Sequence, residues 1–267
     1  MLRDKLAAAM LVAILAVGYC HDAKADGLPK SGTGILPIGE VAKAGTTSWS
    51  GFYVGAHGGY TWGDWSASVA HPCPNCVPDP FSGSGDLNTN GWLAGIQMGA
   101  DKQFGSLVLG LAVDVSKGDL DGSRTFRMDY DTDWAVRTSI DWMGSARLRL
   151  GYATGPLLLY VTGGFAWARV ETEMDTISIT GPVTMSELSS KSWHFGHVLG
   201  GGAEWAIAQS WTLSIEYLHY DLGSANYDPK GLAYAGTPGE FAHHELMSGN
   251  LVFDVARVGI NYRFGAK

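Results

Sequence analysis

The chain has 267 residues, of which 46% are hydrophobic and 16% are charged, with 37 glycines and 10 tryptophans. This length allows one large domain or two small ones, and the apolar content excludes a disordered composition. The formal net charge of −8, without any basic run, excludes a general nucleic-acid binder. Charged residues are scarcer, and glycines more abundant, than in an average globular protein.

The first 25 residues have the three parts of a secretory signal peptide. Two basic residues open it, residues 6–17 form an uncharged apolar run, and an A-x-A motif ends at Ala25. The run is too short for a comfortable transmembrane helix. We therefore expect 1–25 to be a signal peptide that is removed, which leaves a net charge of −9. Residues 26–48 are rich in Gly, Pro, Ser and Thr without a sustained period, and we interpret them as a flexible periplasmic segment.

From residue 51 onward, apolar side chains alternate with polar or small ones, as is typical of β-strands. In the first case Phe52, Val54 and Trp62 share one face, while Tyr53 and His57 share the other. Eight segments alternate in this way: 51–63, 91–104, 107–116, 140–152, 157–168, 193–205, 211–220 and 255–264. Each is about long enough to cross a bilayer as a tilted strand.

The connections between these segments alternate in length. Three of them are short turns, whereas long polar stretches lie near 64–90, 116–138, 171–191 and 221–249. Tight turns at one end and long loops at the other are typical of an outer-membrane barrel, and an even strand number closes the sheet. We predict an all-β fold, an eight-stranded antiparallel transmembrane β-barrel over residues 49–264, located in the cell outer membrane.

A soluble eight-stranded barrel is the main alternative, with its apolar faces turned inward. Too many charges lie on the opposite faces for that arrangement, and the apolar faces end in aromatic residues such as Trp62, Trp142 and Tyr262, as membrane girdles do. The membrane alternative is therefore favoured.

Six stretches in order resemble one family. They are WSGFYVGAHGGYTWG, DWMGSARLRLGY, LLLYVTGGFAWARV, GGGAEWAI, IEYLHYDLG and VARVGINYRF. Together they resemble the strands of the small outer-membrane immunogenic protein family of Gram-negative bacteria, across residues 49–264. The resemblance implies an OmpA-like eight-stranded barrel, an abundant surface antigen with a small-pore or envelope-structural role rather than catalysis. We expect no cofactor.

The resemblance also marks the closing strand. Tyr262 and Phe264 stand where the family carries the aromatic signal that the outer-membrane assembly machinery reads. Family chains normally end on that aromatic residue, whereas Gly265, Ala266 and Lys267 follow here. A second departure is His197, at a lipid-facing position that is usually aromatic.

Charged residues on the inward faces predict a network inside the barrel. A barrel of eight strands is just wide enough for its own side chains, so buried charges must pair. We expect a central network of these residues, with Tyr160 beside it: Asp114, Arg147, Arg149, Glu204, Glu216 and Arg257. As a plug it would fix the register of the barrel. As a gate it would open a narrow pore when pairs exchange.

Cys73 and Cys76 remain after removal of the signal peptide and lie in the first long loop, next to His71. Exported cysteines usually pair, and the surrounding prolines oppose the helix that a redox motif needs. A zinc site would need about four ligands, and no second C-x-x-C motif exists. We expect a small loop disulfide.

Three classes of function remain: a structural or interaction barrel, a small pore, and an outer-membrane enzyme. The expected partners are the lipid bilayer, lipopolysaccharide and unidentified host or cell-surface ligands. Histidines near the fourth long loop (His219, His243 and His244) and the nearby Ser224 and Ser248 show no spacing typical of catalysis, so we expect no enzyme. Acidic residues of the second loop are candidate ligands for divalent cations, although a solvated loop that keeps the surface soluble is the favoured interpretation: Asp119, Asp121, Asp129, Asp131 and Asp133.

Overall fold

The computed structural model describes residues 47–70, 82–129, 132–178, 184–227, 230–233, 241–244 and 246–265. Its strands are β1 (Gly51–Ala70), β2 (Ser82–Phe104), β3 (Leu107–Asp129), β4 (Thr132–Thr154), β5 (Leu157–Ser178), β6 (Thr184–Ala206), β7 (Trp211–Tyr227), β8 (Lys230–Ala233), β9 (Phe241–His244) and β10 (Leu246–Phe264). Within this described part, no helix has the length and hydropathy needed to cross a membrane.

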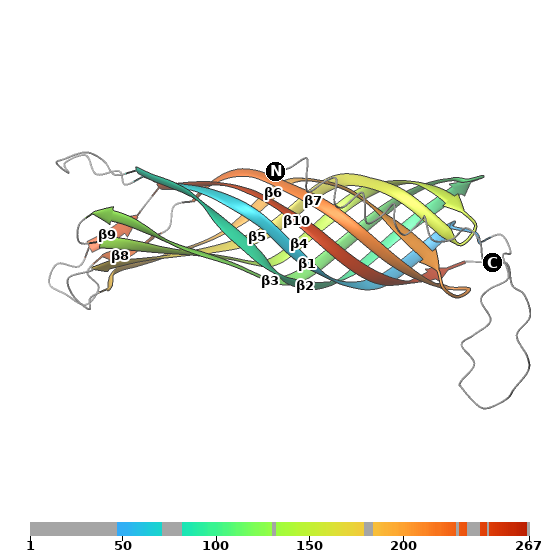
Figure 1. The fold of residues 1–267 in the computed structure, drawn as a ribbon, viewed down its shortest axis with the longest axis horizontal. Coiled ribbons are helices and arrows are strands. Elements are labelled where there is room, and N and C mark those ends of the chain that lie inside the picture. Colours follow the sequence, from blue (N-terminus) through green and yellow to red (C-terminus); the bar gives the residue numbers. More distant parts are fainter. Residues whose placement is uncertain are drawn as a thin grey trace, which may run out of the picture.

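Eight of these strands close into a ring. Strands β1 to β7 pair antiparallel with their sequence neighbours, β10 pairs with β7, and β10 returns to β1 with Phe52 opposite Phe264. The result is a long barrel in which every wall strand has two neighbours (Figure 1). The predicted eight-stranded antiparallel barrel is confirmed. The short strands β8 and β9 form an extra hairpin that pairs with residues 186–189 of β6.

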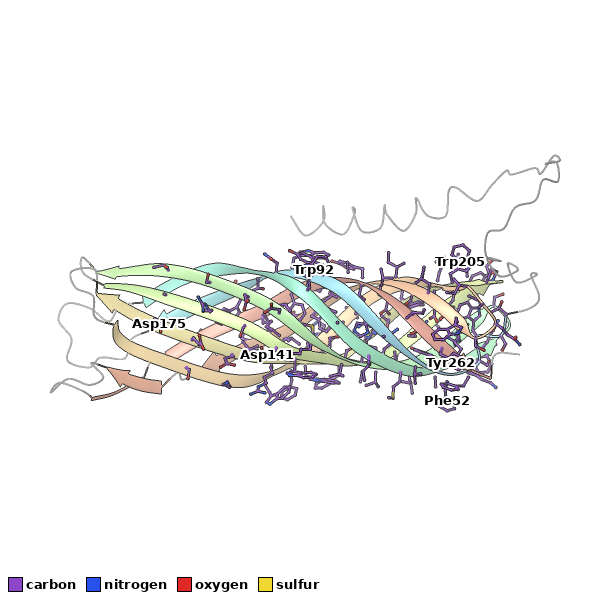
Figure 2. All side chains as sticks on the ribbon, turned by 90° about the horizontal axis from the view of Figure 1, so that it is seen from below. Phe52, Trp92, Asp141, Asp175, Trp205 and Tyr262 are labelled. Atoms are coloured by element: carbon purple, nitrogen blue, oxygen red, sulfur yellow. The ribbon has the colours of Figure 1, made fainter. Side chains whose placement is uncertain are left out.

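The two faces of the wall have opposite polarity. On β4, Leu148 is 62% exposed on the outside, whereas its neighbours Arg147 and Arg149 are 3% and 4% exposed on the inside. Apolar side chains cover the outer wall from the level of Trp205 to the level of Trp92 (Figure 2). A soluble barrel would show the reverse, because water would face the charged side. The outside of this barrel is therefore matched to lipid.

The strands are longer than the sequence pattern predicts. Strands β3 and β4 have 23 residues each, whereas a tilted strand crosses a bilayer in about 9–11 residues. Much of the stretches 116–138 and 171–191, expected as loops, is strand. The outward side chains become polar there, but the inward Leu120, Val136 and Val170 stay buried and apolar. The apolar residues of the outer face thus end before these extensions, while buried apolar residues continue inside them.

Two of the tight turns depend on glycine. Gly105 between β2 and β3 has φ 64°, and Gly155 between β4 and β5 has φ 59°. This left-handed conformation is easily adopted only by residues without a Cβ. The turns hold neighbouring strands in register at the end of the barrel where the short connections lie.

A paired substitution on β3 tests the membrane boundary. Leu111 lies in the middle of the outer apolar band and Ser123 lies on the outer face beyond it, and both are exposed. We expect Leu111→Arg to lower the free energy of unfolding by about 2–4 kcal/mol, because it places a charge near the bilayer midplane. Ser123→Arg, the matched control, should change it by less than about 1 kcal/mol. Urea unfolding in lipid vesicles measures both values. Equal costs for the two substitutions would show that the membrane boundary does not lie between Leu111 and Ser123.

Candidate functional site: the filled interior of the barrel

The end of the barrel with the short turns is closed by Trp49. This residue precedes β1 and is completely buried. Its backbone N–H donates to Gln103 Oε1 at 2.8 Å, and its indole Nε1–H donates to the carbonyl oxygen of Gly155 at 3.3 Å. The ring packs in a small apolar cluster with Val108 and Leu158. The segment before β1 thus folds into the barrel and closes this end, before the chain continues as the first strand of the wall.

Above Trp49 lies the first group of charges, which we call the inner-leaflet cluster: Asp101, Arg149, Glu204 and Arg263. Arg263 donates to Asp101 Oδ2 at 2.7 Å and to Glu204 Oε1 at 3.1 Å. Arg149 donates to Glu204 Oε2 at 2.7 Å and lies 3.8 Å from Asp101 Oδ2. Two arginines and two carboxylates therefore alternate, and the cluster carries no net formal charge.

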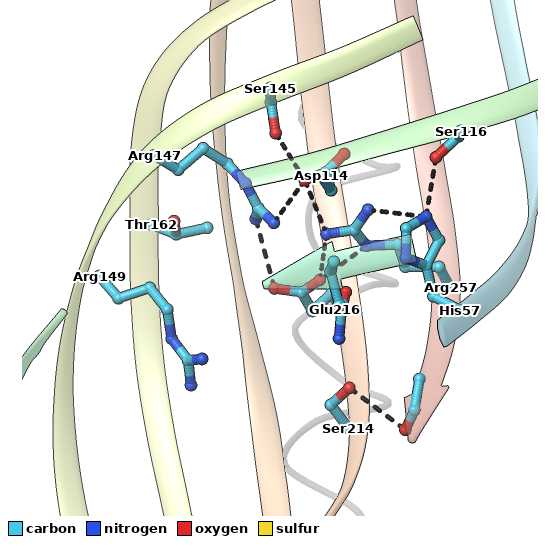
Figure 3. Close-up of polar contacts among 12 residues, drawn as sticks. His57, Asp114, Ser116, Ser145, Arg147, Arg149, Thr162, Ser214, Glu216 and Arg257 are labelled. Atoms are coloured by element: carbon cyan, nitrogen blue, oxygen red, sulfur yellow. Dashed lines mark hydrogen bonds and ion pairs between the residues drawn. The ribbon is translucent and has the colours of Figure 1, made fainter. Parts of the chain in front are cut away.

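A second group, the central cluster, follows along the barrel axis: Asp114, Arg147, Glu216 and Arg257 (Figure 3). Arg147 lies 2.9 Å from Asp114 and 3.3 Å from Glu216. Arg257 reaches the same two carboxylates, at 3.2 Å and 2.6 Å. Ser145 donates a further hydrogen bond to Asp114 Oδ1 at 2.7 Å. This cluster also balances two positive against two negative charges, with planar guanidinium groups that can each serve two acceptors.

All six residues of the predicted network are buried and ion-paired, but they belong to two groups. Arg149 and Glu204 lie in the inner-leaflet cluster, whereas Asp114, Arg147, Glu216 and Arg257 form the central cluster. The ion pairs of the expected network thus fall into two groups, and Tyr160, which is hydrogen-bonded to Glu216, lies between them. Tyr160 lies beside Arg149, whose guanidinium carbon is 4.0 Å from its ring centroid. Alternation predicts which side chains face inward, but it does not predict their height in a tilted, staggered wall.

Among the interior residues that sequence reasoning missed are three ionisable ones. Asp101 and Arg263 lie on the same inward faces as the predicted residues and complete the inner-leaflet cluster. The alternation pattern alone would have included them. His57 is the third, and its Nε2 lies 2.7 Å from Ser116 Oγ and 3.3 Å from a nitrogen of Arg257. Since a guanidinium can only donate, Nε2 acts as an acceptor there.

The half of the interior beyond the central cluster is mainly apolar, with a few buried polar side chains, Thr61, Thr89, Thr138, Thr172 and His194, among its residues. Tyr220 and Phe253 stack with ring centroids 4.8 Å apart and planes at 9°. The buried residues of this outer core are Trp65, Leu93, Leu120, Val136, Ile140, Met143, Ala166, Ala168, Val170, Val198, Leu218, Tyr220, Leu222, Leu251, Phe253 and Val255. Transferring an ion through such packed apolar side chains is costly. Along the described barrel, charged layers thus lie between an apolar mouth and an apolar core.

Of the other predicted site residues, some lie on the outer wall and some lie outside the described residues. Tyr262 and Phe264 lie exposed on the outer wall of β10, with ring centroids 5.0 Å apart, and His197 is exposed on β6. Cys73, Cys76, Asp131 and the side chains of Asp129, Asp133, His243 and His244 lie outside the described residues, as do 1–25 and most of 26–48.

The described candidates for metal binding and catalysis lie on β3, β7 and β10. Asp119 and Asp121 are exposed, and the described part contains no group of three or more His, Cys, Asp or Glu side chains suited to a metal ion. His219 contacts Asp254, while Ser224 and Ser248 are exposed.

The division into two clusters predicts which charges are coupled. Glu216 and Arg257 are in direct contact, so Glu216→Gln and Arg257→Met should show a coupling energy of about 1–3 kcal/mol in a double-mutant cycle. Glu204→Gln and Arg257→Met affect separate clusters and should be additive within about 0.5 kcal/mol. Reversible urea unfolding of the refolded barrel gives both cycles. Coupling of equal size in both cycles would contradict the division.

Comparison with known proteins agrees with this architecture. Residues 33–264 match the model of the outer membrane protein beta-barrel domain. The 31 kDa outer-membrane immunogenic protein of Brucella melitensis is 31% identical over 230 residues, which cover 84% of this chain and 87% of that protein. A 22 kDa outer membrane protein of Rhizobium leguminosarum bv. viciae is 29% identical over 68% of each chain.

The outer membrane protease OmpT of Escherichia coli superposes on the barrel with a TM-score of 0.48 and 8% identity, covering 82% of this chain and 98% of that one. The family match extends over nearly all of the barrel, including both charged clusters and the closing strand. The chain therefore belongs to the outer membrane protein beta-barrel family and is a small barrel of the bacterial outer membrane.

Proposed function

We propose that this protein is a closed barrel with an envelope-structural and surface-interaction role, and that it does not serve as a pore. The observation that carries the proposal is the filled interior. Trp49, two charge-balanced clusters and the apolar outer core follow one another along the axis. A solute would have to displace each of these layers in turn.

The balance of charge within each cluster supports a plug. Every arginine in both clusters contacts two carboxylates, and all eight side chains are less than 10% exposed. Removing one partner from such a buried pair leaves an uncompensated charge, which typically costs about 3–5 kcal/mol. A gate built from these pairs would pay that cost whenever it opened without exchanging partners.

A small-solute or ion pore gated by exchange of Arg and Glu partners is the alternative. It would require the outer core to move together with the central cluster, since Tyr220 and Phe253 lie in the outer core next along the barrel. The proposed role includes no catalysis. The proposal assigns the functional surface to the projecting strands and loops, which would contact lipopolysaccharide or host molecules. The Cys73–Cys76 disulfide stays a prediction for that surface.

Assembly follows from the same proposal. Tyr262 and Phe264 present two exposed rings on the closing strand, which pairs with β1 to seal the barrel. We propose that the outer-membrane assembly machinery recognises this end of β10, with the residues after Phe264 tolerated as a tail.

Single-channel recording of the refolded mature protein in a planar bilayer tests the closed state. We expect no discrete current steps, because the charged layers are enclosed between apolar ones. Folding is confirmed first by altered mobility on an unheated gel, and a known porin reconstituted in parallel serves as the conducting control. Steady steps that change in Glu216→Gln would favour the gated pore and overturn the plug.

A further inference from the structure

The outer wall carries an ionisable cluster at the level of its aromatic band. Asp254 lies on β10 between Phe253 and Val255, which point into the core, and it pairs in register with Trp62 on one side and His219 on the other. The hydroxyl of Tyr217 donates to Asp254 Oδ1 at 2.7 Å, and His219 Nδ1 lies 2.7 Å from the same oxygen. Ionisable side chains at membrane depth are costly, so they generally mark functional sites.

A groove in the lipid-facing wall adjoins this cluster. Its floor includes Gly58 and Ala256, and its outward-facing walls include Tyr60, Trp92, Ile215 and Val258. Ala256 is the next outward residue after Asp254 on β10, and it pairs in register with Tyr217. The groove therefore starts where the polar cluster ends. Its outward lining is almost entirely carbon, and the small residues of its floor leave room for a chain of methylene groups.

Aromatic rings connect the groove to the cluster. Tyr60 meets Trp92 edge-on, with ring centroids 5.0 Å apart, and lies 6.4 Å from Trp62 in a stacked arrangement. Trp62 in turn lies 6.4 Å from Tyr217. These four rings form an arc that offers apolar faces next to a carboxylate and an imidazole. Flat rings beside hydrogen-bonding groups are suited to a ligand with one apolar face and several hydroxyl groups.

The charges around the cluster limit which kind of lipid headgroup can bind there. Asp254 and the nearby outward-facing Asp221 bring two carboxylates against one imidazole, which disfavours a phosphate at this point. Since a carboxylate only accepts, His219 donates through Nδ1, and its Nε2 accepts a hydrogen bond when the ring is neutral and donates one when the ring is protonated. Both groups are therefore suited to sugar hydroxyl groups, which donate and accept hydrogen bonds.

We propose that this wall binds one lipopolysaccharide molecule, with an acyl chain in the groove at Ala256 and a sugar held by Asp254 and His219. The four aromatic rings stack on the sugar, and Asp254 and His219 form hydrogen bonds with its hydroxyl groups. The occupant comes from the outer leaflet because the groove and the cluster lie at the end of the apolar band marked by Trp92 (Figure 2). The site uses only the outer wall, so it is independent of whether the interior conducts.

Native mass spectrometry of the refolded protein, titrated in detergent with purified lipopolysaccharide, tests the site. We expect one retained lipid per barrel, and about tenfold weaker retention for Asp254→Asn and His219→Gln, because each loses a hydrogen bond at a charged or polar centre. Ala256→Leu should weaken retention similarly by filling the groove. Ala146→Leu is the matched control, since Ala146 is also outward and exposed but lies on β4 opposite Phe165. Its retention should equal that of the unmodified chain.

Competition distinguishes a built site from ordinary lipid contact. A glycerophospholipid without a sugar should not displace bound lipopolysaccharide, and lipopolysaccharide stripped of its ester-linked acyl chains should bind weakly. Gel mobility before and after heating shows that each variant is folded. Equal retention in all four variants, or displacement by the glycerophospholipid at the same concentration, would overturn the proposal.

Discussion

The pairing of buried charges inside a closed ring is the constraint on which the rest of this structure depends. Because the outside of the wall faces lipid, most charged residues of the membrane-spanning part of the strands point inward, into a space with little water. There, each arginine contacts two carboxylates, as Arg257 does with Asp114 and Glu216. Since these partners come from β3, β7 and β10, the pairs connect non-adjacent walls and fix how the barrel is filled.

The apolar layers at either end give the charged clusters their low-dielectric setting. Trp49 closes one side, held by Arg263, which donates to its carbonyl oxygen at 2.5 Å. The stack of Tyr220 on Phe253 belongs to the core that closes the other. Interactions between charges strengthen when water is excluded, and so does the cost of separating them. The same arrangement that stabilises the plug therefore makes partial opening unfavourable.

The sequence predicted the wall better than its contents. Alternation assigned Arg147 and Leu148 to opposite faces correctly, because a period of two leaves no other choice once one face meets lipid. It did not predict that Arg149 and Arg147 serve different clusters, since axial height depends on strand tilt and stagger. Trp49 was missed as a plug because it precedes the alternating segment. The strand extensions were missed because only their inward residues, such as Leu120, remain apolar.

Because the interior is filled, the proposed function must reside on the outer surfaces of the barrel. These surfaces include the lipid-facing wall. Here the pattern of that wall is not uniform. Most outward positions are aliphatic or aromatic, yet Asp254 is nearly buried among Trp62, Tyr217 and His219 beside a groove floored by Gly58 and Ala256. Anchoring in the bilayer alone would be served as well by apolar residues at every one of these positions. The proposed glycolipid site gives the carboxylate and the imidazole a role at the membrane surface that apolar residues could not fill.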